Sequence, residues 1–248
     1  MWTQNEKNIL VVGHRGADAL YPENTMLSFE KAVEEFGVDG LETDVQMTKD
    51  GVLVLMHDLL VDRTTDGHGN LSDFTLEELK QLDAGGWFSD EFAGQKIPVF
   101  TDFLEYVKGK NLLLNIEIKD YRREVVDQTV CLLEDMGFHD TYVLTCFQGD
   151  VTTYAHETYG VKTQGFPPWK VKNYREDTAR HYYSVGISMG DLTRELCRKY
   201  RSEGIDPWCY CPNDAAAAKK AAACGVSLVT CDNPLPALGE FRKMGVHK

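Results

Sequence analysis

Val38 to Asp58 is the stretch of sequence that decides the fold, and it reads V-D-G-L-E-T-D-V-Q-M-T-K-D-G-V-L-V-L-M-H-D. We expect a strand over Val38–Met47, in which successive side chains alternate between two faces. One face then carries Leu41, Thr43 and Val45, and the other carries Glu42, Asp44 and Gln46. Two carboxylates therefore share one face of this strand.

The pair Asp50-Gly51 is a strong hairpin signal. A two-residue loop at this pair would put Lys49 opposite Val52 and Asp44 opposite His57, so an imidazole would reach the acids. Facing carboxylates repel each other and lose hydration, so a fold keeps them together where a cation compensates, most simply a metal ion. The alternative is an exposed hairpin edge with solvated acids, and this stretch alone leaves both interpretations open.

Length and charge bound the class of protein. The chain has 248 residues, 43% hydrophobic and 26% charged, which suits one large α/β domain. A formal net charge of -13 argues against nonspecific binding to nucleic acid or anionic lipid. The polar stretch Met1–Asn8 shows no secretory signal and no run is long enough to span a membrane, so we expect a soluble, cytoplasmic protein. The oligomeric state stays open.

The seven cysteines are odd in number and scattered without a CxxC pair, which favours reduced thiols over a disulfide framework. Cys209 and Cys211 share one face of a predicted strand. They are either soft-metal ligands or small core residues, and no neighbouring histidine supports the first interpretation.

Strands and helices alternate along the chain. The predicted strands are Ile9–Gly13, Val38–Met47, Leu112–Ile118, Tyr142–Phe147, Val161–Phe166, Val185–Met189, Trp208–Cys211 and Val226–Cys231. The predicted helices are Met26–Phe36, Leu76–Leu82, Asp102–Val107, Arg123–Met136, Asp150–Tyr159, Val171–Tyr182, Leu192–Ser202, Asp214–Cys224 and Leu235–Lys243. Eight alternating strands predict a (β/α)8 TIM barrel. The alternative, an open doubly wound sheet, lacks a Gly-rich dinucleotide fingerprint here.

Residues 51–100 do not fit the strand–helix repeat and are called the insertion below. We expect a small subdomain after the second strand, within a single catalytic domain spanning residues 1–248. Its apolar side chains, which could build a minor core, are Phe74, Trp87, Phe88, Phe92 and Ile97.

Polar side chains gather where the first three predicted strands end. His14 and Arg15 follow the first strand, and the third strand puts Asn115, Glu117 and Lys119 on one face. The carboxyl ends of barrel strands form the site face of the fold. We therefore expect these groups to join the acids of the second strand at one rim.

The assembled rim suits phosphoryl chemistry. Glu42, Asp44 and Glu117 form an all-oxygen set that favours Mg²⁺, Ca²⁺ or Mn²⁺ over zinc. Arg15 and Lys119 add charge for phosphate oxygens inside an acidic protein. His14 and His57 fit general base and general acid, because imidazole titrates near neutral pH.

With these residues assembled, the chain resembles the glycerophosphodiester phosphodiesterase family. The matching motifs are His14-Arg15-Gly16, Pro22-Glu23-Asn24-Thr25, Glu42-Thr43-Asp44-Val45, His57-Asp58, Arg63-Thr64-Thr65 through Leu82-Asp83-Ala84-Gly85, Ile97-Pro98, Glu117-Ile118-Lys119 and Asp232-Asn233-Pro234. The resemblance implies a (β/α)8 barrel with a small insertion, a divalent metal on Glu42, Asp44 and Glu117, and catalysis by His14 and His57.

The resemblance also implies a reaction. A small-molecule glycerophosphodiester would be cleaved to glycerol 3-phosphate and an alcohol, with the substrate's own 2-hydroxyl able to attack phosphorus. The remaining positions take supporting roles: Glu23 and Asn24 orient and cap, Asp58 positions His57, Asn115 orients its neighbours, and Trp208 forms an apolar wall or packs in the barrel.

The seventh predicted strand departs from the family pattern. It reads Trp208-Cys209-Tyr210-Cys211, where we expect a polar residue ending in Asn, so the head-group preference stays open. Two other functions also stay open. One is a lysophospholipase D type activity with an apolar cleft from Phe88 and Phe92, and the other is a noncatalytic glycerophosphate-binding module. The native metal and the order in which the histidines act are not decided by the sequence.

Overall fold

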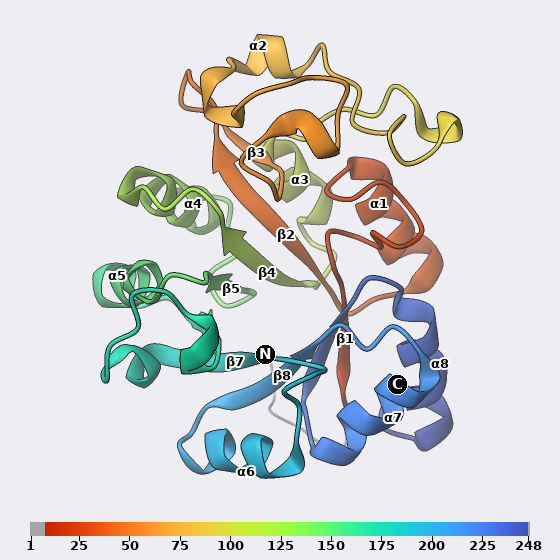
Figure 1. The fold of residues 1–248 in the computed structure, drawn as a ribbon, viewed down its shortest axis with the longest axis vertical. Helices are drawn as coiled ribbons and strands as arrows, with labels where there is room; N and C mark the ends of the chain where they lie inside the picture. Colours follow the sequence, from red (N-terminus) through yellow and green to blue (C-terminus); the bar gives the residue numbers. More distant parts are fainter. Residues whose placement is uncertain (1–7, 248) are drawn as a thin grey trace.

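Nine strands form one sheet that closes on itself (Figure 1), in a computed structural model that describes residues 8–247. The strands are β1 (Leu10–Gly13), β2 (Gly40–Met47), β3 (Leu53–Leu55), β4 (Leu113–Ile118), β5 (Tyr142–Thr145), β6 (Thr163–Gly165), β7 (Tyr182–Ser188), β8 (Asp206–Tyr210) and β9 (Leu228–Cys231). Only β3 runs antiparallel, and β1 pairs with both β2 and β9. The predicted (β/α)8 barrel is confirmed. Of the polar N-terminal stretch, residues 1–7 lie outside the described part.

Helices surround the barrel (Figure 1). They are α1 (Met26–Glu30), continued by a π-helical turn (Lys31–Phe36), α2 (Leu76–Leu79), α3 (Phe100–Val107), α4 (Arg123–Asp135), α5 (Gly149–Tyr159), α6 (Arg194–Ser202), α7 (Ala215–Cys224) and α8 (Pro234–Met244). Side-chain caps begin several of them: Thr25, Thr193 and Asp214 each accept a hydrogen bond from a backbone N–H of the first turn. Within residues 8–247, the helices are all too short or too polar to cross a membrane.

The predicted helix Val171–Tyr182 is wrong. This segment instead contains two short 3₁₀ turns, Pro168–Lys170 and Thr178–His181, and β7 begins at Tyr182. Asn173 lies between the turns with φ +54°, a left-handed conformation that interrupts a right-handed helix. The chain therefore reaches β7 through an irregular loop.

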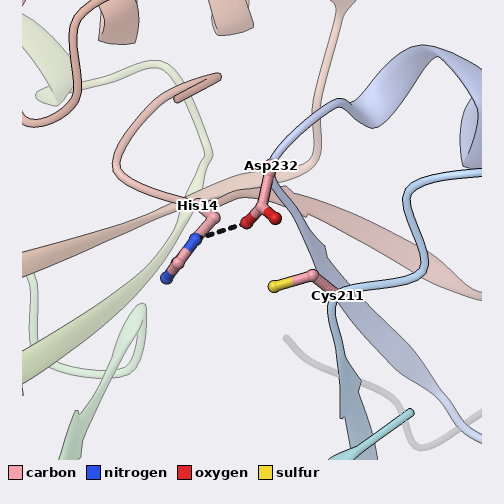
Figure 2. Close-up of side chains that lie close together, drawn as sticks. All are labelled: His14, Cys211 and Asp232. Carbon is pink, nitrogen blue, oxygen red and sulfur yellow. Dashed lines mark hydrogen bonds and ion pairs between the residues drawn. The ribbon is translucent and has the colours of Figure 1, made fainter. Parts of the chain in front are cut away.

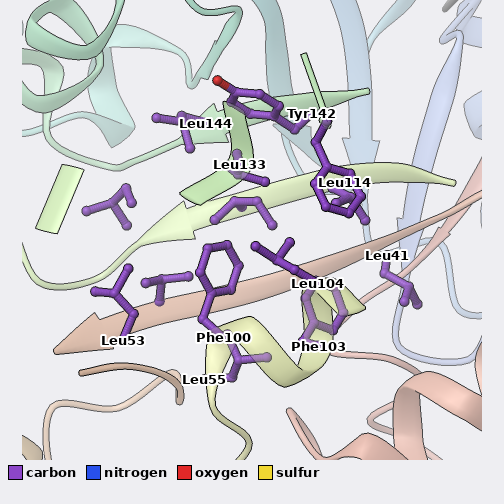
Figure 3. Packing of buried hydrophobic residues seen from close by; sticks show 14 of the residues in the cluster. Leu41, Leu53, Leu55, Phe100, Phe103, Leu104, Leu114, Leu133, Tyr142 and Leu144 are labelled. Carbon is purple, nitrogen blue, oxygen red and sulfur yellow. The ribbon is translucent and has the colours of Figure 1, made fainter. Parts of the chain in front are cut away.

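The two faces of β2 and β4 separate the core from the site. Leu41, Val45, Leu114 and Ile116 belong to a buried cluster between the sheet and the helices, which Figure 3 shows with Phe100, Phe103 and Leu104 of α3. A second kind of cluster lies inside the barrel, because its members come from strands on opposite sides and still contact one another. These members are Val12, Leu113, Val143, Trp208 and Leu228. Side chains therefore fill the lower barrel, and the polar faces are left for the upper end.

The β2–β3 hairpin has a different register from the predicted one. Val45 pairs with Leu55, and the Met56 N–H donates to the Asp44 carbonyl at 3.0 Å, so Asp44 is opposite Met56 and not His57. The reason is a three-residue loop: the Thr48 N–H donates to Val52 O, and Gly51 adopts φ +82°. One extra loop residue shifts the pairing by one position.

The rest of the insertion builds its own small core, as predicted. Its buried residues are Val54, Met56, Val61, Leu71, Leu79, Ala84 and Ile97, with Phe74 packed against them. The other aromatic residues do not join this core. Phe88 contacts Trp87 and Phe92, and Phe92 contacts Tyr21 on the barrel side, with ring centroids 5.6 Å apart.

Candidate active site

Three carboxylates meet at the upper end of the barrel. Glu42 and Asp44 lie on β2 and Glu117 lies on β4, where the parallel register puts Asp44 directly beside Glu117. One oxygen from each of the three side chains lies within 4.8 Å of the other two, and all three residues are buried. The structure thus brings together the three acids predicted from strand alternation. The alternative of an exposed, solvated hairpin edge does not fit their burial.

Two cationic side chains face these acids. Arg15 Nε lies 3.2 Å from one oxygen of Asp44, and Lys119 Nζ lies 2.5 Å from Glu117 and 3.3 Å from the other Asp44 oxygen. Burial opposes ionisation of Asp44, but Lys119 and Arg15 hold the pKa of this carboxyl below its ordinary value. Asp44 is therefore ionised at neutral pH.

Glu42 has the opposite balance. Burial and the neighbouring Asp44 charge raise the pKa of Glu42 to about 8, although His14 and Arg15 favour its ionised form. Its carboxylate accepts one backbone hydrogen bond, from the Arg15 N–H at 3.0 Å. An additional positive charge beside Glu42 would stabilise this buried carboxylate.

The carboxylates could hold a metal ion. Among the described residues, Asp44 Oδ1 is buried and accepts no hydrogen bond, so it retains a lone pair for a ligand. Three acids converge on a point that only two cationic side chains reach at ion-pair distance. An all-oxygen set of this kind fits a hard divalent cation.

His14 follows β1 and is held by acids. Its Nδ1 lies 2.6 Å from Asp232, shown in Figure 2, and 3.2 Å from Asp18, while Nε2 lies 3.8 Å from Glu42. Burial lowers the pKa of His14, but Glu42, Asp18, Asp232 and Cys211 outweigh that effect and raise it well above the ordinary value. Asp232 therefore orients the ring through Nδ1 and leaves Nε2 on the side of the acids.

His57 is held in the same way from the insertion. Its Nδ1 lies 2.6 Å from Asp58. Arg63 donates to Asp58 at 2.6 Å and to Glu23 at 2.6 Å, and Glu23 also accepts from Arg15 at 2.9 Å. A continuous charge network thus connects Arg15, beside the acids, to the imidazole of His57.

A cavity of about 210 Å³ opens between these groups. Of the predicted site residues, it is lined by His14, Arg15, Glu42, His57, Asn115, Glu117, Lys119 and Trp208. The others lie behind this lining. Asp44 is fully buried, Asn24 donates to Asp44 at 2.8 Å, and Glu23 and Asp58 hold the charge network. Asn115 donates to Gln164 at 3.0 Å.

Sequence reasoning missed the opposite wall of the cavity. Its main side chains are Phe147, Phe166 and Tyr210. Phe147 and Phe166 stack with centroids 3.6 Å apart, and Phe166 meets Tyr210 edge-on. The available signal was position, because each residue lies at or just after the carboxyl end of its strand. Phe88 and Phe92, proposed as an apolar cleft for an acyl chain, do not line this cavity.

Three other residues complete the picture. Trp208 closes the floor of the cavity and donates to Asp206 at 2.9 Å, so it is both a lining and a packing residue. Cys209 packs in the core beside Met189, whereas Cys211 points toward His14 and Asp232 in Figure 2. The two cysteines therefore do not converge on a shared ligand. Sequence reasoning assigned no role to Arg63 or Asp232, although both lie in motifs that it singled out.

Comparison with known proteins is consistent with this geometry. The sequence model of the glycerophosphoryl diester phosphodiesterase family matches residues 14–235. A glycerophosphodiester phosphodiesterase from Caldanaerobacter subterraneus is 33% identical over 246 residues, covering 95% of this chain and 99% of that relative.

Solved structures match over nearly the whole chain. A phosphodiesterase from Oleispira antarctica, solved in complex with the product sn-glycerol-3-phosphate, has a TM-score of 0.86 at 25% identity and covers 94% of this chain and 96% of its own. A glycerophosphodiester phosphodiesterase from Agrobacterium tumefaciens has a TM-score of 0.80 at 26% identity and covers 92% and 98%. Fold, cavity and family thus agree.

Proposed function

This chain belongs to the glycerophosphoryl diester phosphodiesterase family, and from that premise we propose a metal-dependent hydrolysis of glycerophosphodiesters to sn-glycerol 3-phosphate and an alcohol, with His14 and His57 as general acid and base. The enzyme class, a phosphoric diester hydrolase acting on small glycerophosphodiesters, follows from the family. One observation carries the finer proposal. His14 and His57 line the same cavity as Glu42, Glu117 and Lys119.

Glu42, Asp44 and Glu117 would hold the cation, which we assign as Mg²⁺ or Ca²⁺, with Mn²⁺ as a further candidate, because the donor set is all oxygen. A divalent ion there supplies positive charge to phosphoryl oxygens as they gain negative charge. Zinc fits this set less well, since it prefers nitrogen and sulfur ligands.

Arg15 and Lys119 would bind the phosphoryl group. Both line the cavity beside the acids, and burial lowers but Glu117 and Asp44 raise the pKa of Lys119, with the net effect of keeping its ammonium charged. Charge-assisted hydrogen bonds to phosphate act over short range, so they operate inside an acidic protein. The two side chains would orient phosphorus for in-line attack.

The histidines would move the protons. Each has Nδ1 within 2.6 Å of a carboxylate, Asp232 for His14 and Asp58 for His57, which leaves Nε2 for proton exchange. In the proposed first step, one imidazole removes the proton of the substrate's 2-hydroxyl and the other protonates the leaving alkoxide. The 2-hydroxyl oxygen bonds to phosphorus, the head-group alcohol leaves, and water opens the cyclic phosphate with the proton roles reversed.

Phe147, Phe166 and Tyr210 would form the wall against the carbon part of the substrate. They offer apolar area and ring faces in a cavity of about 210 Å³, a volume suited to a small polar diester. No charged residue lines this side in the described structure, so we expect the wall to select by shape. The whole chain would act as one catalytic domain, with residues 51–100 supplying His57.

A coupled assay for sn-glycerol 3-phosphate release tests the proposal. Purified protein is incubated with glycerophosphocholine, glycerophosphoethanolamine and glycerophosphoglycerol, each with excess chelator and with added Mg²⁺, Ca²⁺ or Mn²⁺. We expect release only when a divalent ion is present. Lysophosphatidylcholine serves as the comparison substrate, and preference for it would favour lysophospholipase D activity instead. Undiminished release in excess chelator would refute the metal requirement, and no release from any diester would support a noncatalytic module.

A further inference from the structure

A second group of metal-ligating side chains lies beside the carboxylate site, and Figure 2 shows its members His14, Cys211 and Asp232. One potential ligand atom from each lies within 4.8 Å of the other two. Barrel closure brings them together. Cys211 and Asp232 each stand one residue beyond a strand, β8 and β9, and β9 pairs with β1, which ends just before His14. This group is called the His–Cys–Asp cluster below.

The donor atoms of the His–Cys–Asp cluster differ from those of the carboxylate site. Sulfur, imidazole nitrogen and one carboxylate form a set that suits zinc, and thiolate does not suit Mg²⁺ or Ca²⁺. Zinc lies about 2.3 Å from sulfur and about 2.0–2.2 Å from nitrogen and oxygen. Atoms already within 4.8 Å of one another therefore need only small side-chain movements to share one ion.

We propose that the His–Cys–Asp cluster binds a borderline-soft divalent cation of the zinc class and that this binding inhibits the hydrolase by capturing His14.

The surroundings of the cluster favour an ion. Asn213 holds the Asp232 carboxylate from behind with a hydrogen bond of 2.5 Å, and also accepts from the Asp232 N–H at 3.0 Å. This second layer orients a ligand, as outer-shell partners do in metal sites. The three residues are partly exposed, so an ion can reach them. Asp18 lies 3.2 Å from His14 Nδ1, and its other oxygen is buried and accepts no hydrogen bond within residues 8–247. Asp18 is thus a candidate fourth ligand.

The inhibition follows from the nitrogen that the ion would use. Nδ1 is the nitrogen beside Asp232, so an ion shared by these two residues takes the lone pair of Nδ1. A neutral imidazole bound through Nδ1 keeps its proton on Nε2, the nitrogen near Glu42 at 3.8 Å. His14 then cannot accept a proton on the cavity side. This consequence rests on the proposed catalytic role of His14, whereas the binding itself does not.

A cadmium titration tests binding without using activity. The protein is saturated with Mg²⁺ so that the carboxylate site is occupied, and Cd²⁺ is added while the ultraviolet charge-transfer band of a cadmium–thiolate bond is recorded. We expect one equivalent to give the band in the natural protein. Cys211→Ser should weaken this binding by at least the roughly 10- to 100-fold that loss of an outer-shell ligand partner costs. Cys131→Ser is the matched control, because Cys131 is an exposed thiol on α4 far along the chain from the cluster.

An unchanged band in Cys211→Ser, or a band lost in Cys131→Ser, would overturn the proposal. Asp232→Asn provides a second variant that should weaken the band without removing the thiol; full-strength binding in this variant would also count against the cluster. Circular dichroism confirms that each variant is folded.

Inhibition is measured separately in the sn-glycerol 3-phosphate assay with Mg²⁺ in excess. We expect the Zn²⁺ concentration for half-inhibition to rise at least about ten-fold in Cys211→Ser and to stay unchanged in Cys131→Ser. A cadmium band in a protein that hydrolyses no diester would refute the proposed function and leave the metal site standing. Equal zinc inhibition of the natural protein and Cys211→Ser would refute the inhibitory role.

Discussion

The two sides of the barrel mouth carry different chemistry. The side built from β1, β2 and β4 lines the cavity with His14, Glu42, Glu117 and Lys119, whereas the side built from β5 to β9 lines it with aromatic and neutral groups. We call these the charged side and the aromatic side. The difference teaches that proton transfer and charge stabilisation are concentrated on three neighbouring strands, while the remaining strands shape the cavity. Each side can therefore be altered with a different kinetic consequence.

Disabling the metal site should have the largest effect. Chelation, or Asp44→Asn, removes the cation or one of its ligands from the charged side, and we expect the rate of sn-glycerol 3-phosphate release to fall to background. Added Mg²⁺ or Ca²⁺ should restore the chelated enzyme but not the variant. Asp120→Asn is the control, because Asp120 pairs with Arg122 outside the cavity. A rate equal to that of the untreated enzyme in either experiment would contradict the comparison.

Removing the imidazoles should come next. His14→Ala and His57→Ala should each lower kcat by about 10²- to 10⁴-fold, the usual contribution of general acid–base catalysis. Binding of Mg²⁺, followed by calorimetry, should persist, because neither histidine belongs to the carboxylate group. His68→Ala, an exposed histidine of the insertion that pairs with Asp62, should leave kcat unchanged. Activity at the natural level in either cavity variant would show that the charged side does not supply proton transfer.

Cutting the charge network should have a moderate effect. Arg63→Ala breaks the ion pairs to Asp58 and Glu23, both at 2.6 Å, so His57 loses the group that holds its partner. Arg63 is 44% exposed, so solvent screening limits the loss to about 1 kcal/mol, roughly five-fold in kcat/KM. Arg122→Ala, which breaks an exposed ion pair with Asp120, is the control. A loss as large as that of His57→Ala would mean that Arg63 itself contacts the substrate.

The smallest effect should come from the aromatic side. Phe147→Leu removes the ring that stacks on Phe166 but retains apolar volume, and such a ring pair is worth about 0.5–1.5 kcal/mol. We expect KM to rise by roughly two- to ten-fold with little change in kcat. Phe88→Leu, an aromatic residue of the insertion that does not line the cavity, should change neither constant. A fall in kcat as large as that of the histidine variants would erase the distinction between the two sides.

The charged side could be predicted from the sequence because it depends on local rules. Alternation along a strand puts Glu42 and Asp44 on one face, and the same rule puts Glu117 beside Lys119. The core positions Leu114 and Ile116 follow from the same alternation. Barrel closure then needed only the count of strands.

Other features depend on contacts that no local rule contains. The hairpin register was shifted by one residue because Gly51 adopts a left-handed conformation in a longer loop. The helix expected at Val171–Tyr182 is interrupted at Asn173. Cys211 and Asp232 reach His14 only because β9 pairs with β1, two strands that lie at opposite ends of the chain. Sequence spacing carries no signal for such a contact.

One feature of the insertion has an evolutionary consequence. Val54 and Val99 form an antiparallel bridge, and the Leu55 N–H donates to the Pro98 carbonyl, so both ends of the segment leave the barrel side by side. The entropy of closing such a segment grows only slowly with its length. Its interior also has a separate set of buried side chains. Residues between these anchors can therefore be lengthened, trimmed or exchanged between homologues as a module, while His57 stays at the same distance from the joint.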